Sequence, residues 1–205
     1  MNRFTEIREN KIKREYFLGE NVIEIARDLI GRTLVSSVDG KLCKGLIVET
    51  EAYRGYDDKA CHANNGRRTK RNEVMYGQGG HAYVYLCYGI HHLFNIVTNK
   101  KGKADAVLVR AMHPIEGEDM MQTRFSAPKK LLGKGPGVLT KAMGITTELS
   151  GEDLSSDRIW IESGIQNRDD LDIVTCKRVG VDYAEEDADL PWRFYLNGNE
   201  HVSRK

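Results

Sequence analysis

Two carboxylates and a group of aromatic side chains lie within one quarter of the chain, between Val48 and Asn95. Glu49 and Glu51 are two positions apart, so on an extended strand their side chains point to the same face. Tyr53 follows on that face. A carboxylate beside an apolar ring loses solvation, which makes it a better base toward a held water molecule. The alternative is a pair of solvated acids at the end of a surface strand, and the pattern alone leaves both interpretations open.

Paired carboxylates at a defined separation are also the usual catalytic residues of enzymes that cleave glycosidic bonds between sugars. In this chain we expect Glu51, at the end of its strand, to face a cleft. We expect Glu49 to have a structural role instead.

Three tyrosines follow in the segment 83–89, which reads Y-V-Y-L-C-Y-G. Tyr83 and Tyr85 share one face of a predicted strand, whereas Tyr88 falls at the following turn, where an aromatic side chain is poorly buried. Nucleobases stack on such rings with about 1–3 kcal/mol each. A projecting side chain can also open a base step and kink a duplex. For Tyr83 we favour the simpler interpretation, a residue of the core or the sheet surface.

Cationic side chains are concentrated in two segments, 59–71 and 129–141, although the formal net charge of the chain is only +1. Arg67 and Arg71 belong to a polar loop that begins at Cys61, and Lys134 lies in the sequence G-K-G-P-G (133–137). These three are candidates for contacts with a phosphate backbone, and the glycine-rich stretch could present N–H groups at a helix start. Solvated faces are the alternative for each basic run. Arg110 lies in an apolar strand, so if buried it needs an anionic partner.

Histidine and cysteine side chains occur near one another in the sequence, at Cys61, His62, His81, Cys87, His91 and His92. No spacing among them matches a zinc signature. We therefore expect no metal ligands and no cofactor. His62, in the basic loop, is a candidate hydrogen-bond donor and stacking surface, with an ordinary loop histidine as the alternative.

The elements that must position these residues indicate a single α+β domain with a mainly antiparallel sheet. Asn21 is a potential helix cap, and Asp39-Gly40 favours a tight hairpin turn. We treat residues 1–20 as a peripheral extension of the one domain, 1–205. We expect helices over 21–30, 116–124 and 138–143, strands over 33–38, 42–52, 82–87, 93–98, 158–162, 173–178 and 193–196, and a strand from 106 to 112 that Pro114 ends.

Length and composition narrow the class of protein further. A chain of 205 residues suits one sizeable domain, and its four cysteines form no C-x-x-C pair, which favours a reducing compartment. The charged N-terminus lacks an apolar signal core, and no apolar run approaches the ~18 residues of a membrane helix. We therefore expect a cytoplasmic protein without membrane contact.

Several of these motifs together resemble one family, the alkyladenine (3-methyladenine) DNA glycosylases of base-excision repair. The matching segments run in order along most of the chain, and they are V-E-T-E-A-Y (48–53), A-C-H (60–62), R-R-T-K-R-N (67–72), Y-V-Y-L-C-Y-G (83–89) with Asn95, V-L-V-R-A (107–111), G-P-G-V-L-T-K-A (135–142), R-V-G-V (178–181) and W-R-F-Y-L (192–196). The resemblance implies a curved sheet with surrounding helices and a protruding hairpin. It also implies a monomer that binds double-stranded DNA containing damaged purines, close to the nucleoid.

The resemblance assigns roles to particular residues. Glu51 matches the general base that activates water, and Arg110 matches a residue near that water and the nucleotide phosphate. Tyr88 matches the side chain that fills the space left in the duplex. The backbone near Leu196 resembles a segment that helps to hold the water. The base pocket is assigned to Tyr53, His62 and Tyr85, which match its aromatic walls, and to Asn95, which matches a residue that disfavours the amino group of guanine.

The implied activity is that of a monofunctional glycosylase that flips and excises alkylated purines, namely 3-methyladenine and 7-methylguanine, and also hypoxanthine, leaving an abasic site. The family uses neither a metal ion nor a Schiff base. Two alternatives remain: a module that binds damaged DNA without cleaving it, and a metal-dependent hydrolase built on the cysteines and histidines.

Overall fold

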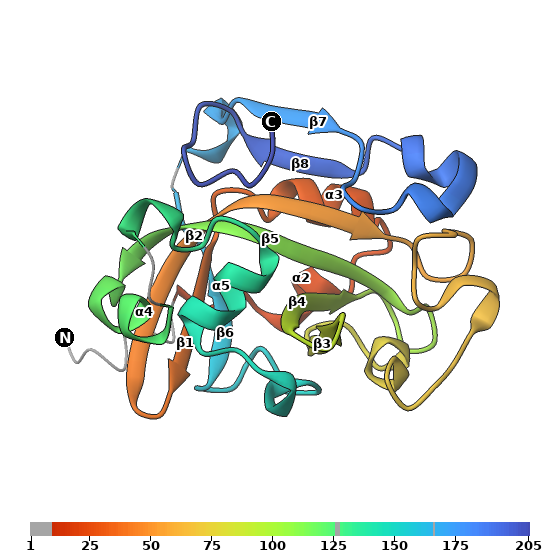
Figure 1. Cartoon of the computed structure of the whole chain (residues 1–205). Coiled ribbons are helices and arrows are strands. Elements are labelled where there is room, and N and C mark those ends of the chain that lie inside the picture. The colour runs from red at the N-terminus through yellow and green to blue at the C-terminus, as the bar shows by residue number, and fades with distance from the viewer. Residues whose placement is uncertain (1–9, 126–127, 166) are drawn as a thin grey trace.

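The computed structural model describes residues 10–125, 128–165 and 167–205 of the chain, and it has the expected α+β architecture (Figure 1). All its strand pairings are antiparallel, and the main path through the sheet is β3-β4-β5-β2-β1-β6, with β8 joined to β2 and β7 joined to β8. The strands are β1 (Thr33–Val38), β2 (Lys41–Tyr53), β3 (Ala82–Cys87), β4 (His91–Thr98), β5 (Asp105–Glu116), β6 (Ile159–Glu162), β7 (Ile173–Cys176) and β8 (Arg193–Leu196).

Strand β2 is the centre of the sheet. One of its edges pairs with β5 over most of its length. The other edge pairs with β1 in the first half of the strand and with β8 over Glu49, Thr50 and Glu51. The turn between β1 and β2 is the predicted one, because Asp39 and Gly40 both have positive φ (54° and 67°). The second half of β2 therefore lies between two strands, and its side chains are enclosed.

Four α-helices of the described chain pack around this sheet: α2 (Arg14–Phe17), α3 (Val22–Asp28), α4 (Glu118–Arg124) and α5 (Pro136–Met143). Figure 1 shows α4 and α5 near each other and α3 beside β8. The predicted cap at Asn21 is confirmed, since its side chain accepts hydrogen bonds from the N–H groups of Ile23 and Glu24. The largest apolar core combines residues of α3 and α5 with residues of β2, β4 and β5.

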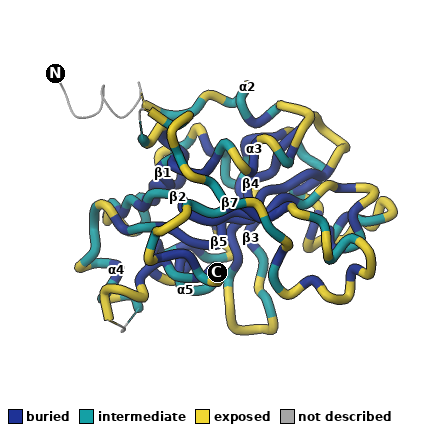
Figure 2. The backbone as a smooth tube through the Cα atoms, turned by 90° about the horizontal axis from the view of Figure 1, so that it is seen from above, coloured by how far each residue is buried: buried dark blue, intermediate teal, exposed yellow. Residues whose placement is uncertain are grey.

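Hairpin β3–β4 lies at one end of the main strand path, and its tip extends from the body of the protein as an exposed loop (Figure 2). The N–H of Ile90 donates to the carbonyl of Cys87 across the tip. Tyr88 and Gly89 both have positive φ (50° and 73°), and Gly89 accepts this conformation without steric cost. The tight turn thus places the side chain of Tyr88 at the outermost point of the hairpin.

Several boundaries differ from the prediction. Pro114 does not end β5, which continues to Glu116 with Pro114 opposite Gly45, next to an irregularity in the ladder. A proline is tolerated at such a position because no regular ladder bond is lost. Helix α5 begins at Pro136, whose fixed φ suits the first helical position.

The N-terminal segment divides into two parts. Residues 1–9 lie outside the described residues, whereas Phe17 is buried and the backbone of Lys11 bridges to Glu162.

Within the part of the chain that the structure describes, no helix combines the length and the apolar character needed to cross a lipid bilayer.

Candidate functional site

The predicted acids lie at the centre of the sheet, and both are fully buried. Glu51 lies opposite Leu108 of β5 and Arg193 of β8. Two shifts of register interrupt the β2–β5 ladder close to Glu49, and in β5 they leave Arg110 without a partner position. Such bulges re-aim a side chain. The guanidinium of Arg110 accordingly lies between the two carboxylates.

The carboxylate of Glu51 is held by three hydrogen-bond donors. Tyr53 donates its hydroxyl to Oε2 (2.8 Å), and Nη1 of Arg110 donates to the same oxygen (3.2 Å). The backbone N–H of Val179 donates to Oε1 (2.7 Å). An ionised carboxylate can accept about four hydrogen bonds, two at each oxygen. Among the described residues Oε1 therefore retains one acceptor position for a water molecule.

Glu49 supports this arrangement from the neighbouring position. It accepts hydrogen bonds from Nε of Arg110 (2.9 Å) and from the N–H and hydroxyl of Ser203 (2.6 and 3.0 Å). Nε of Arg193 lies 3.4 Å from Oε1 of Glu49. One acid thus fixes the arginine that contacts the other, which agrees with the structural role expected for Glu49.

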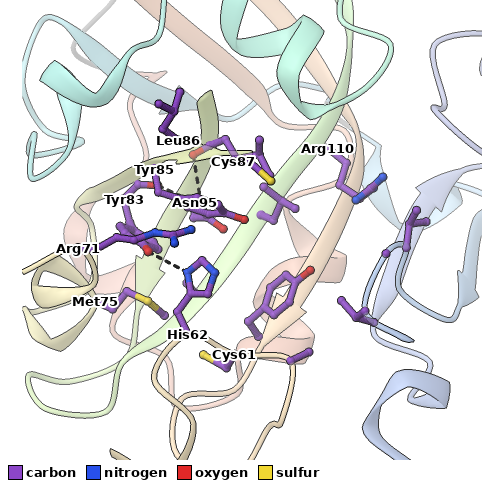
Figure 3. A pocket seen from close by; sticks show the side chains of 18 of the residues that line it. Cys61, His62, Arg71, Met75, Tyr83, Tyr85, Leu86, Cys87, Asn95 and Arg110 are labelled. Carbon is purple, nitrogen blue, oxygen red and sulfur yellow. Dashed lines mark hydrogen bonds between the residues drawn. The ribbon is translucent and has the colours of Figure 1, made fainter. Parts of the chain in front are cut away.

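A pocket of about 420 Å³ is lined by His62, Asn95 and Arg110, among other residues (Figure 3). This volume falls within the range of about 300–1,000 Å³ of small-molecule sites. Glu51 does not line the pocket itself. Three residues that contact Glu51 do line it: Tyr53, Arg110 and Val179. The remaining lining residues are Ala60, Cys61, His62, Arg71, Met75, Tyr83, Tyr85, Leu86, Cys87, Tyr88, Leu93, Asn95, Ala106, Leu108, Gly180, Val181 and Tyr183.

Aromatic side chains from two elements meet in one wall of this pocket. The ring of His62 contacts Tyr85 edge-on, with 4.6 Å between centroids, and its Nδ1 is joined to the hydroxyl of Tyr83 by a hydrogen bond of 2.9 Å, drawn in Figure 3. Tyr83 and Tyr85 lie 5.4 Å apart. Tyr83 is buried, as expected, but it also lines the pocket.

The charge state of His62 follows from this environment. Burial lowers the pKa of the imidazole from 6.5 to about 4, and the cations of Arg71 and Arg67 act in the same direction. The ring is therefore neutral at pH 7 and can stack on a cationic partner without charge repulsion.

Asn95 is held rigidly in the pocket wall. Its Nδ2 donates to the backbone carbonyl of Tyr83 (3.1 Å), and the side chain is almost fully buried. This bond fixes the orientation of the amide in the pocket wall.

A buried ion pair packs against the ring of Tyr53. Arg178 forms a bidentate pair with Asp58 (2.5 and 2.8 Å), and its guanidinium lies 4.9 Å from the centre of the Tyr53 ring. Burial, reinforced by the negative charge of Glu51, raises the pKa of Tyr53 well above its usual value. The hydroxyl therefore stays protonated and remains a donor to Glu51.

Exposed apolar side chains surround the mouth of the pocket. Tyr88 is 91% exposed at the hairpin tip, Leu86 and Ile90 are exposed on the same hairpin, and the exposed Tyr183 also lines the pocket. A large exposed side chain at a tight turn does not serve the core, and such clusters mark contact surfaces.

The three cations predicted to contact a DNA backbone occupy different places. Arg71 is exposed, lines the pocket and lies 4.8 Å above the ring of Tyr85. Arg67 is exposed in the same loop and influences His62. Lys134 does not line the pocket, and its charge acts on His201 near the C-terminus.

The sequence prediction missed Val179, Arg178 and Asp58. The motif R-V-G-V contained the signal for the first two, but nothing in it indicated a contact with Glu51. The role expected for the backbone near Leu196 stays a prediction: Leu196 packs in apolar clusters and lies three positions beyond Arg193, which pairs with Glu51.

The structure also shows the surroundings of an acidic run, residues 185–189, and of the cysteines and histidines discussed above. The acidic run at 185–189 binds the loop at Lys59, which contacts Glu185, Glu186 and Asp187. The cysteines and histidines near Cys61 and His91 do not bring three potential metal ligands together in the described residues.

A buried carboxylate held by donors that line a pocket of flat rings is an arrangement suited to hydrolysis at a bond to a ring-shaped group. The comparisons with known proteins agree: the model of the methylpurine-DNA glycosylase family matches residues 16–200. The chain belongs to this family and is therefore a hydrolase of N-glycosyl bonds that works in DNA repair.

Relatives from distant bacteria cover nearly the whole chain. A protein of Desulfitobacterium hafniense is 45% identical over 204 residues, covering 95% of this chain and 99% of the relative. A protein of Chlamydia felis is 48% identical over 185 residues, covering 89% and 94%. One from Clostridium acetobutylicum is 44% identical over 202 residues, covering 94% and 97%. All three carry the provisional name 3-methyladenine DNA glycosylase.

Proposed function

We propose that the protein flips a methylated purine out of duplex DNA into the aromatic pocket and hydrolyses its bond to the sugar. The observation that carries this proposal is the carboxylate of Glu51. It is held by Tyr53, Arg110 and Val179, which all line the pocket, and its Oε1 has a single donor among the described residues.

The chemical step requires only water. Glu51 accepts a proton from a water molecule, whose oxygen forms a bond to C1′ of the nucleotide. The bond from C1′ to the purine nitrogen breaks, and its electron pair leaves with the base. Methylation at N3 or N7 makes the purine cationic, so this electron pair neutralises the ring. The products are an abasic site and the free base, and no covalent bond to the protein forms.

The pocket favours a cationic ring over a neutral one. Cation–π attraction to a tyrosine face contributes roughly 0.5–2 kcal/mol, and Tyr53 and Tyr85 both line the pocket. His62 is neutral at pH 7 and adds no repulsion. Unmodified adenine and guanine gain neither this attraction nor a weakened glycosidic bond.

Flipping costs a few kcal/mol of stacking and pairing energy. Tyr88, exposed at the tip of the hairpin, is placed to enter the space that the flipped nucleotide leaves. Arg67 and Arg71, exposed in the neighbouring loop, are suited to nearby phosphates. These contacts offset the cost and hold the duplex in its opened form.

The candidate substrates are 3-methyladenine, 7-methylguanine and hypoxanthine. 7-Methylguanine carries an amino group at C2 that 3-methyladenine and hypoxanthine lack. The amide of Asn95 is fixed in the pocket wall, where a bound purine would meet it. We expect 3-methyladenine, which is cationic in the nucleotide and lacks this amino group, to be excised fastest. Rates of excision from duplexes that each carry one of the three lesions test this order.

The decisive experiment is the substitution Glu51→Gln, which keeps the shape of the side chain and removes the base. We expect excision from methylated duplex to fall by at least about 10³-fold, while binding to the same duplex is retained. Glu118→Gln is the control, since Glu118 lies outside the pocket lining and its side chain is 44% exposed. Normal formation of alkali-labile abasic sites by Glu51→Gln would show that Glu51 is not the base. If the wild-type protein formed no such sites, the protein would bind damaged DNA without cleaving the base from it.

A further inference from the structure

A second group of chemically active side chains lies outside the pocket. His113 of β5 and the C-terminal residues Glu200 and His201 approach so closely that their potential ligand atoms all lie within 4.8 Å of one another. Among the residues that the structure describes, they form the one group of three with this property. None of them lines the pocket beside Glu51.

The hydrogen bonding of His201 leaves one ring nitrogen free to bind a metal ion. Its Nδ1 lies 2.8 Å from the backbone carbonyl of Leu132. A carbonyl oxygen can only accept, so Nδ1 carries the proton and Nε2 carries the lone pair. A histidine that donates one N–H to a backbone carbonyl and offers its other nitrogen is the usual arrangement in metal sites. His201 is also buried, so its ring is fixed.

The imidazole of His113 has a ring nitrogen without a hydrogen-bond partner among the described residues. Its Nδ1 is buried and has no hydrogen-bond partner in the described structure. A buried polar atom without a partner is costly. The rings of His113 and His201 lie 4.6 Å apart at 77°, an edge-on contact that gives Nδ1 no partner.

We propose that His113, Glu200 and His201 bind a first-row divalent metal ion, for which zinc is the best match, and that the ion fastens the C-terminal segment to β5. Two imidazoles and one carboxylate suit such an ion better than magnesium or calcium, which prefer oxygen ligands. Their single negative charge partly compensates the ion. Zinc takes nitrogen and oxygen at about 2.0–2.2 Å, so the ligand atoms must close to about 3.3 Å. Glu200 is exposed and is free to make this adjustment.

The location of the site indicates what the ion would do. Ser203 lies two residues beyond His201 and donates two hydrogen bonds to Glu49, which in turn holds Arg110. Val202, between them, is buried against Val48 and Ala111. An ion at His201 would therefore stabilise the segment that supports the acid cluster, while taking no part in the hydrolysis. This inference is independent of the proposed function.

Zinc binding by the full-length, tag-free protein tests the proposal. After treatment with a chelator and dialysis, the protein is titrated with zinc in competition with a metal indicator. We expect one zinc ion per chain and a rise in Tm of about 5 °C or more at 100-fold excess over Kd. His113→Gln and Glu200→Gln should each weaken binding at least tenfold, whereas His81→Gln, a histidine outside the group, should leave it unchanged.

Two further measurements keep the result interpretable. Glu200 is exposed, so Glu200→Gln should keep the metal-free Tm of the wild type, and a loss of binding in this variant is not a loss of folding. With cobalt in place of zinc, the near-ultraviolet spectrum should lack a thiolate charge-transfer band, because no cysteine belongs to the site. Undetectable zinc binding, equal affinity in all variants, or a thiolate band would each overturn the proposal.

Discussion

The hydroxyl of Tyr53 donates a hydrogen bond of 2.8 Å to Oε2 of Glu51, two positions earlier on the same strand. Tyr53 thus contributes its ring to the pocket and its hydroxyl to the carboxylate behind it. Binding of the base and orientation of the acid are joined in one side chain, and the two contributions can be separated by mutation.

Tyr53→Phe should keep the ring and lose the hydrogen bond. Bonds to charged groups contribute about 1.5–3 kcal/mol, so we expect the single-turnover rate of excision to fall by about 10- to 100-fold with little change in binding of damaged duplex. Tyr16→Phe is a matched control, because Tyr16 also donates to a carboxylate, that of Asp28, in a different part of the molecule. A rate for Tyr53→Phe equal to that of the control would contradict the assignment.

Glu49→Ala should affect stability strongly. It leaves the nearly buried guanidinium groups of Arg110 and Arg193 without the carboxylate they share, and removal of one member of a buried pair costs about 3–5 kcal/mol. Urea denaturation measures the change. The exposed pair of Glu118 and Lys129 provides the comparison, since Glu118→Ala should cost less than about 1 kcal/mol. Equal losses of unfolding free energy in the two variants would show that Glu49 does not stabilise the two buried arginines.

Tyr88→Ala should lower excision from duplex DNA much more than excision from single-stranded DNA. The side chain is 91% exposed, so its removal should leave the Tm unchanged. Excision from duplex DNA should fall at least tenfold because nothing fills the vacated space, whereas excision from a single strand carrying the same lesion should change little. Tyr56, exposed to 70% and outside the pocket lining, is the control. Undiminished excision from duplex by Tyr88→Ala would refute the proposed insertion.

The ring of His62 should titrate near pH 4, which NMR of the imidazole resonances can follow. Because its pKa in the folded protein lies below that of the unfolded chain, folding favours the neutral ring. The resulting stability is present above about pH 6.5 and is lost as the pH falls toward 4. Arg71→Gln should raise the pKa, yet not to 6.5, because burial is the larger cause. A titration near pH 6.5 in the wild-type protein would show that the ring is solvated.

Sequence patterns were sufficient for most of the sheet. The helix after Asn21, the turn at Asp39-Gly40 and the β3–β4 hairpin all follow from capping, turn chemistry and alternation, which are properties of neighbouring residues. The continuation of β5 through Pro114 could not be foreseen in this way. It depends on the irregular register opposite Gly45, which only the partner strand provides.

The site was predictable in its residue types and not in its contacts. Alternation correctly placed Glu49 and Glu51 on one face, since Arg110 contacts both. The enclosure of Glu51 was not foreseen, because it requires β8 and Val179, which lie more than 120 residues further along the chain. Periodicity contains no information about such contacts. The resemblance to a family identified the segment R-V-G-V without showing what its backbone does.

The position of β2 between β5 and β8 has a consequence for engineering. The acid is carried by the most constrained strand of the sheet, whereas His62 comes from a loop and Asn95 from the terminal hairpin. Substitutions at His62 or Asn95 therefore reshape the walls of the pocket without removing a donor to Glu51. This scaffold offers a starting point for retargeting excision to other modified bases by changing the walls alone.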